Sequence, residues 1–299
     1  MKVVVSGASG FVGVPLVASL RSQGHEVLQL VRRLPRTAEE IEWAPERGEI
    51  DSAALEGVQA AVNLSGAGVG DKRWSAEYKR IIRDSRVDSA RTLATALAGL
   101  DRRPEVLLQS SGADYYGDTG EEIVNERHAR GDGFLADVCA EWEAAARPAQ
   151  DAGIRTAHLR TCLVLGPGGG ALGKLMPLFR LGLGGRMGRG KMWWSWITLH
   201  DTLAAIAFLL ETDVHGPVNL AAPGPVTNAE FTSSLAGSLH RPALAVVPPF
   251  ALRAGLGEFA STVLASHRIV PQVLLDAGFT FAHNDIGAAT QWLAAQPRK

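Results

Sequence analysis

A glycine-rich turn follows the first short apolar run of the chain and constrains the fold more than any other feature. Gly7-Ala-Ser-Gly-Phe-Val-Gly13 comes directly after Val3-Val-Val5. A buried strand, a glycine turn and a helix in this order begin a βαβ unit, in which bare backbone N–H groups approach a phosphate. Leu16, Val17 and Leu20 then recur at helical spacing, as that unit requires. The sequence therefore predicts a Rossmann unit that binds a nicotinamide dinucleotide.

Short β-branched runs alternate with helical patterns over the first 165 residues. This alternation is typical of an α/β fold with a doubly wound parallel sheet. The expected strands span Val3 to Val5, Glu26 to Val31, Ala60 to Leu64, Val106 to Gln109 and Thr156 to Leu165. The expected helices span Gly13 to Gln23, Ser75 to Leu97 and Leu135 to Ala152.

The composition of the chain changes after Leu165, where glycine becomes frequent. Residues 166–173 and 182–190 are expected to be loops at a hinge into a smaller α/β substrate lobe. Three more helical segments are expected after Pro223. The predicted division is a Rossmann domain over residues 1–165, to which residues 196–222 return, and a lobe made of residues 166–195 and 223–299.

The end of the second predicted strand indicates which dinucleotide is bound. A Rossmann domain that binds NAD usually carries Asp or Glu about twenty residues after the glycines, to bind the ribose 2'-hydroxyl. Here that strand ends in Arg32-Arg33. Two guanidinium groups suit a 2'-phosphate, so we predict NADP over NAD by about tenfold or more. The alternative is a solvated pair of arginines. Ser6 and Ser9 are expected to add hydroxyl donors to the phosphates.

Composition excludes several classes of partner. The chain has 30 basic and 31 acidic residues and no long run of like charge, so we expect no nucleic-acid partner. The longest apolar run, Leu203 to Leu210, is too short to span a bilayer. Cys139 and Cys162 are too few for a disulfide framework and have no ligands at metal spacing. Met1-Lys2 leads straight into a strand, and we expect a cytoplasmic protein without a metal site.

Motifs spread over the whole chain resemble one family. They are Asn63-Leu-Ser-Gly66, Arg73-Trp74, Ser85-Arg86, Ser111 ahead of Tyr115-Tyr-Gly117, Trp142-Glu143, Gly166-Pro-Gly-Gly-Gly170, Trp196-Ile197 with His200-Asp201, Asn219, Pro223, Thr227-Asn228, Phe231, Pro271 and Gly278-Phe279. The chain resembles an atypical, extended-like short-chain dehydrogenase/reductase. Within that superfamily it is similar to the epimerase family proteins that end in a small domain of unknown function.

The resemblance implies a set of cofactor contacts. It implies that Gly7, Gly10, Phe11 and Val12 lie along the pyrophosphate, next to the hydroxyl expected from Ser9. Further contacts implied at matching positions are Arg32 at the adenosine end, Leu64 and Ser65 along the cofactor, Arg86 beside it and Asp137 on the nicotinamide side. For Arg86, a structural salt bridge from the long helix is the alternative.

Catalysis is where the chain departs from its superfamily. Typical members place Tyr and Lys as Tyr-x-x-x-Lys on one helix face, so that Lys lowers the tyrosine pKa and Tyr exchanges a proton with the substrate. Counting back from Trp142-Glu143, those positions fall at Leu135 and Cys139. We predict Ser111 and Tyr115 as the catalytic residues. Simple turn capping for Ser111 and aromatic packing under the nicotinamide for Tyr115 are the alternatives.

Two readings of function remain open from the residues. The first is an NADP-dependent oxidoreductase or epimerase-like enzyme acting on a small carbonyl or hydroxyl compound. A homodimer is one oligomeric state open to it. The second is a non-catalytic NADP(H)-binding or redox-sensing protein. His200-Asp201 has the look of a catalytic dyad, but we interpret Asp201 as the N-cap of the next helix and His200 as a packing residue.

Overall fold

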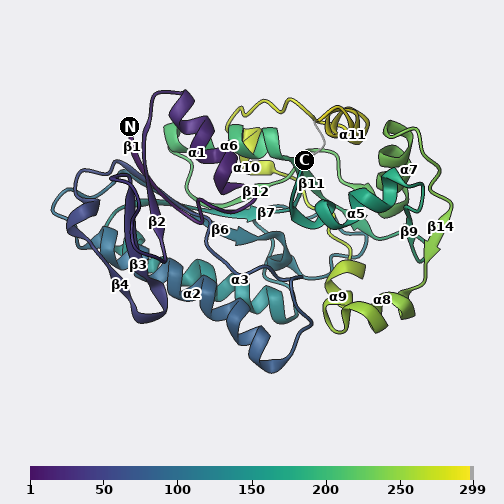
Figure 1. Ribbon diagram of the computed structural model, residues 1–299, viewed down its shortest axis with the longest axis horizontal. Coiled ribbons are helices and arrows are strands. Elements are labelled where there is room, and N and C mark those ends of the chain that lie inside the picture. Colours follow the sequence, from purple (N-terminus) through teal and green to yellow (C-terminus); the bar gives the residue numbers. More distant parts are fainter. Residues whose placement is uncertain (297–299) are drawn as a thin grey trace.

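An eight-stranded sheet with helices on both faces forms the centre of the molecule (Figure 1). The computed structural model describes residues 1–296. The strand order is β12-β7-β6-β5-β1-β2-β3-β4, and every neighbouring pair is parallel except β3 with β4. The strands are β1 (Lys2–Ser6), β2 (Glu26–Val31), β3 (Glu40–Ala44), β4 (Glu49–Ile50), β5 (Ala60–Asn63), β6 (Val106–Gly112), β7 (Arg155–Thr161) and β12 (Gly216–Leu220). This is the α/β, doubly wound parallel sheet that the sequence predicts.

Alternate side chains of the strands build a separate core on each face of the sheet. Val3 and Val5 face α1 (Gly13–Ser22) and α6 (Leu199–Glu211), whereas Val4 faces α2 (Ala76–Ala98) and α4 (Arg147–Asp151). All three valines are fully buried. Burial on both faces explains why the first strand is an unbroken apolar run rather than an alternating one.

Two predicted elements are each divided in the structure. The expected helix from Leu135 to Ala152 is α3 (Phe134–Ala144) followed by α4, whose first turn contains Pro148. A proline has no N–H and fits only the start of a helix, so a new helix begins there. The expected strand from Thr156 to Leu165 is likewise β7 and then β8 (Leu163–Leu165), which pairs with β11 (Trp196–Thr198) away from the main sheet.

A smaller lobe lies at one end of the sheet (Figure 1). Its elements are α5 (Gly170–Arg180), β9 (Gly185–Met187), β10 (Trp193–Trp194), β13 (Val226–Thr227), α7 (Asn228–Ser238), β14 (Ala245–Val247), α8 (Pro249–Leu256), α9 (Phe259–Leu264) and α11 (Ile286–Ala294), whereas α10 (Gln272–Asp276) contacts β12 of the main sheet. Its core packs Leu172, Phe179, Trp196, Phe231 and Leu293 together. Two expectations were wrong here. The first glycine-rich stretch enters α5 and the second contains β9, and five helices rather than three lie between Pro223 and residue 296.

The last part of the chain also contacts the main sheet. β12 extends the sheet beside β7, and Leu274 and Phe279 pack in the same core as Val3 and Val5. We therefore propose that residues 271–281 be counted with the Rossmann domain, in a division that otherwise follows the sequence. Within residues 1–296, no helix combines the length and apolarity needed to cross a bilayer.

Candidate cofactor and substrate site

The glycine turn brings β1, α1 and the end of β5 into direct backbone contact. Gly7 has a φ of +66°, and a Cβ there would lie 2.7 Å from the carbonyl of Leu64. At Gly13 a Cβ would lie 2.1 Å from the carbonyl oxygen of Gly7. No side chain fits at either position, because real Cβ atoms do not approach backbone so closely.

The start of α1 presents unused hydrogen-bond donors. Across residues 1–296 the amide N–H groups of Phe11, Val12 and Gly13 have no acceptor, and Val12 at the N-cap supplies no side-chain cap. Ser9 is exposed beside them. The free amides and the positive end of the helix dipole together favour an anion such as a pyrophosphate.

The neighbouring strand end is ordered by a hydrogen-bond network. Ser6 is fully buried and donates its hydroxyl proton to Asn63 Oδ1. Ser65 donates from its hydroxyl to Ser6 Oγ at 3.0 Å and from its backbone N–H to Asn63 Oδ1 at 3.1 Å. Ser6 was therefore wrongly expected as a phosphate donor, since its proton is used inside the fold. The same bonds hold Leu64 and Ser65 at the edge of the sheet next to the glycine turn.

The two arginines after β2 have different surroundings. Arg33 donates to both carboxylate oxygens of Glu40, at 2.7 and 2.5 Å, and its hydrogen bond lowers the pKa of that carboxyl to about 2. Arg32 is exposed and has no hydrogen bond or ion pair in the described part of the chain. Both arginines were predicted to bind the 2'-phosphate, but Arg33 is paired with Glu40 and only Arg32 of the two has no partner in the described residues.

Arg86 is a half-buried residue on α2, and its side chain lies against Gly66 after β5. Its Nη1 donates to the Ile82 carbonyl at 2.9 Å, and the guanidinium lies 5.1 Å from the ring of Trp142. A Cβ on Gly66 would lie 3.2 Å from the Arg86 side chain. Burial lowers the pKa of Arg86. No carboxylate lies within ion-pair distance of it among residues 1–296, so the alternative of a structural salt bridge is wrong.

The face of α3 that looks toward the sheet carries Cys139 rather than Asp137. Asp137 is exposed and forms an ion pair with Arg130, which counts against its predicted place beside the nicotinamide. Cys139 is buried, and a Cβ on Gly112 at the end of β6 would lie 3.1 Å from its sulfur. Burial raises the pKa of the Cys139 thiol to about 12. Leu135 has no titratable group and Cys139 stays protonated at neutral pH, so the residues at the usual Tyr and Lys positions cannot act as that pair.

A buried polar network joins β6, α3, β7 and β12 below this edge. Ser111 Oγ donates to Glu143 at 2.7 Å, and Glu143 accepts two bonds from Arg160, at 2.8 and 2.9 Å. Arg160 Nη1 also donates to the Tyr116 hydroxyl at 3.0 Å, which in turn donates to Asn219 at 2.8 Å. None of these contacts was predicted from the sequence. The signal for them was Arg160, a charged residue within a predicted strand.

The two adjacent tyrosines differ in what their hydroxyls do. Tyr116 is buried within the network, and burial raises its pKa to about 12. Tyr115 is half-buried, and its ring lies 3.4 Å from the guanidinium carbon of Arg160 in a cation–π contact. In the described residues its hydroxyl has no hydrogen-bond partner. Tyr115 is therefore the tyrosine whose hydroxyl is free to meet a ligand.

Acid sensitivity is expected from His158, which shares a face of β7 with Arg160. Burial is the main cause that lowers the pKa of His158, with Glu143 opposing it and Arg160 adding to it. Because the unfolded chain then binds a proton more readily, the free energy of unfolding should fall as the pH drops below about 6.5. In His158→Gln that fall should be shallower by up to about 1.4 kcal/mol per pH unit in urea titrations. The exposed His215→Gln is the matched control, and an equal slope in both variants would contradict the prediction.

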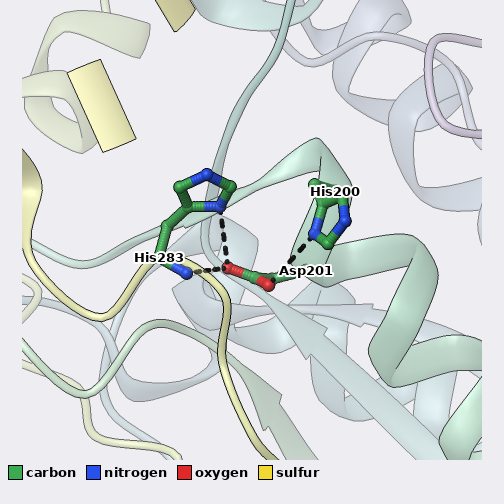
Figure 2. Close-up of side chains that lie close together, drawn as sticks. All are labelled: His200, Asp201 and His283. Carbon is green, nitrogen blue, oxygen red and sulfur yellow. Dashed lines mark hydrogen bonds and ion pairs between the residues drawn. The ribbon is translucent and has the colours of Figure 1, made fainter. Parts of the chain in front are cut away.

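His200, Asp201 and His283 lie together where the lobe meets α6 (Figure 2). The N-cap of α6 is Thr198, whose hydroxyl oxygen accepts from the Asp201 N–H, so the N-cap assignment of Asp201 was wrong. His200, with 54% of its side chain exposed, is also not a packing residue. The Asp201 carboxylate accepts from the backbone N–H groups of Ala282 and His283 at 2.9 and 3.0 Å and from the Thr198 hydroxyl at 3.0 Å.

These contacts explain the cluster without a metal ion. Asp201 lies in the first turn of α6, where the helix dipole favours an anion and disfavours a cation. Three donors from the fold already satisfy its carboxylate. We interpret Asp201 as a structural residue whose carboxylate holds the segment around His283 against the start of α6 by hydrogen bonds.

Comparison with known proteins assigns the chain to a family. Residues 3–221 match the NAD dependent epimerase/dehydratase family, and residues 247–293 match DUF1731, a domain of unknown function. The chain belongs to the epimerase family. An epimerase family protein of Mycobacterium bovis is 43% identical over 99% of this chain and 98% of its own length. The human epimerase family protein SDR39U1 is 34% identical over 99% of this chain and 100% of its own length. The family resemblance proposed from the sequence is thereby confirmed.

Solved structures of relatives carry the same architecture. The crystal structure of human epimerase family protein SDR39U1 with NADPH has a TM-score of 0.92, with 32% identity over 98% of this chain and 99% of that one. A nucleoside-diphosphate sugar epimerase from Corynebacterium glutamicum has a TM-score of 0.79 and 36% identity over 97% of this chain and 57% of its own length. A UDP-glucose 4-epimerase from Thermus thermophilus, at 18% identity, shares the fold, with a TM-score of 0.74.

Proposed function

We propose that this epimerase family protein binds NADP(H) along the carboxyl edge of β1, β2, β5 and β6. The free amides of Phe11, Val12 and Gly13 at the start of α1 carry this proposal, because they are placed for a pyrophosphate. Arg32 and the half-buried Arg86, which has no ion pair in the described residues, supply positive charge along the same edge. The NADPH in the crystal structure of the human relative gives independent support for this choice of cofactor.

We further propose an oxidoreductase or epimerase-like reaction on a small carbonyl or hydroxyl compound held between the sheet and the lobe. The cofactor supplies hydride chemistry when bound. Tyr115 is proposed as the proton donor, since its hydroxyl is free and Arg160 holds its ring. Ser111 is buried and already donates its hydroxyl proton to Glu143, so any substrate contact is limited to accepting a hydrogen bond at Oγ.

The second candidate function is NADP(H) binding without turnover, as in a redox sensor. Leu135 and Cys139 at the usual Tyr and Lys positions favour it, because both side chains are buried and neither exchanges a proton near neutral pH. A cytoplasmic location is proposed separately, and it is supported by Cys139 and Cys162, which are both buried and form no disulfide in the described residues.

A titration and a turnover assay test the proposal together. We expect the purified protein to bind NADPH at least about tenfold more tightly than NADH by nicotinamide fluorescence. NADPH consumption with a panel of ketones and aldehydes then separates enzyme from sensor. Tyr115→Phe should lower any turnover by about 10²-fold or more with the NADPH dissociation constant unchanged, because it loses only the proton donor. Equal turnover in Tyr115→Phe would remove Tyr115 from the mechanism, and equal affinity for NADH would overturn the choice of NADP.

A further inference from the structure

Glu40 lies beside Arg33, one of the two arginines predicted to bind the 2'-phosphate. It begins β3, which runs parallel to β2 with Glu40 opposite Gln29, so its side chain reaches the loop that follows β2. Only 11% of the Glu40 side chain is exposed. Its Oε2 atom accepts the backbone N–H of Arg36 at 2.6 Å as well as Nη1 of Arg33. The carboxylate is thus fixed inside the loop rather than free in solvent.

This arrangement occupies Arg33. Both of its terminal nitrogens donate to the Glu40 carboxylate, and Nη1 also donates to the Leu34 carbonyl at 2.9 Å. A bidentate pair of this kind uses the planar fork that would otherwise grip a phosphate. It also cancels the charge of Arg33 and leaves a carboxylate close to where the 2'-phosphate would lie. Arg32, one residue earlier, is exposed and makes no such pair within residues 1–296.

We propose that Glu40 limits the preference of the site for NADP(H) over NAD(H). Its carboxylate holds Arg33 in an ion pair, so that only Arg32 contacts the 2'-phosphate. The inference rests on the proposed binding of NADP(H) and adds a residue to it that acts against affinity. A dinucleotide held by one guanidinium rather than two dissociates more easily. The proposal makes Glu40 a specificity-determining residue outside the glycine motif.

The two small nucleotides 2',5'-ADP and 5'-AMP isolate the contribution of the 2'-phosphate. Calorimetric titration of each should show that Glu40→Gln binds 2',5'-ADP about five- to tenfold more tightly than the native protein, because Arg33 is released and a negative charge is lost. Affinity for 5'-AMP should stay within about twofold, since it lacks that phosphate. Arg33→Met in the native background should weaken 2',5'-ADP binding modestly, because it leaves the Glu40 carboxylate without its counter-charge near the phosphate. In the Glu40→Gln background it should remove the part of the gain that comes from Arg33.

Glu39→Gln is the matched control. It removes the same charge one residue away from an exposed side chain that does not contact Arg33, and it should leave both affinities within about twofold. Weaker binding of 2',5'-ADP in both Glu40→Gln and Arg33→Met would overturn the proposal, since Glu40 would then be orienting Arg33 toward the phosphate. Unchanged binding in Glu40→Gln would overturn it as well. If the native protein shows no preference for 2',5'-ADP over 5'-AMP, the proposed function fails instead.

Discussion

Replacement of Gly13 by alanine is expected to weaken NADPH binding by about 100-fold. The added Cβ would lie 2.1 Å from the carbonyl oxygen of Gly7, so the start of α1 must move away from the end of β1. Overpacking of this kind costs about 1–3 kcal/mol, and a loss of about 2.7 kcal/mol in binding free energy corresponds to about 100-fold in the dissociation constant. The dissociation constant for NADPH, measured by fluorescence titration, tests this expectation.

Gly237→Ala provides the control for this change. Gly237 lies within α7, a Cβ there would meet nothing within 4 Å, and the position is remote from the glycine turn. Its NADPH affinity should equal that of the native protein. If Gly13→Ala binds NADPH within about threefold of the native protein while it remains folded by circular dichroism, the turn does not hold the pyrophosphate.

The second large effect concerns stability rather than binding. Arg160→Met should lower the free energy of unfolding by about 3–5 kcal/mol, because it leaves the carboxylate of Glu143 buried without its counter-charge. Only 4% of the Arg160 side chain and 14% of the Glu143 side chain are exposed. Urea-induced unfolding followed by tryptophan fluorescence measures the loss.

A double variant separates the ion pair from simple loss of packing. In Arg160→Met with Glu143→Gln, part of the lost stability should return, since no uncompensated charge then remains buried. Arg147→Met is the control, because Arg147 forms an exposed ion pair with Asp151, and its removal should cost less than about 1 kcal/mol. Equal losses in the single and double variants would show that the pair is not what stabilises this region.

Local sequence predicted the Rossmann half of the fold well. The strands β1, β2, β5 and β6 and the helices α1 and α2 lie where periodicity placed them, within a few residues. β3 was not predicted, although Ile41 and Trp43 alternate with glutamates in the period-two pattern of a strand. The charged residues on both sides of this short run hid that signal. Secondary structure in the lobe was less predictable, since its short strands and helices are stabilised mainly by packing on one another.

The candidate site was predicted unevenly for a similar reason. Glycine positions are readable from sequence, because only glycine tolerates the close backbone contacts at Gly7 and Gly13. The side-chain partners are not readable. The sequence predicts that Arg33 binds the phosphate, but Glu40 lies beside it and pairs with it. It predicts Asp137 on the nicotinamide side, but Cys139 occupies the face of α3 that lies toward the sheet.

The sequence by itself determined the backbone of the cofactor site, the absence of the usual Tyr and Lys, and the presence of two arginines after β2. These features depend on residues that are close in the chain, where spacing fixes geometry. Only the tertiary structure decided that Arg33 is held by Glu40, that Ser111 donates to Glu143, and that the hydroxyl of Tyr115 is free. Those contacts join strands and helices distant in sequence, and the charge and hydrogen-bonding capacity of a side chain depend on the partner that folding brings to it.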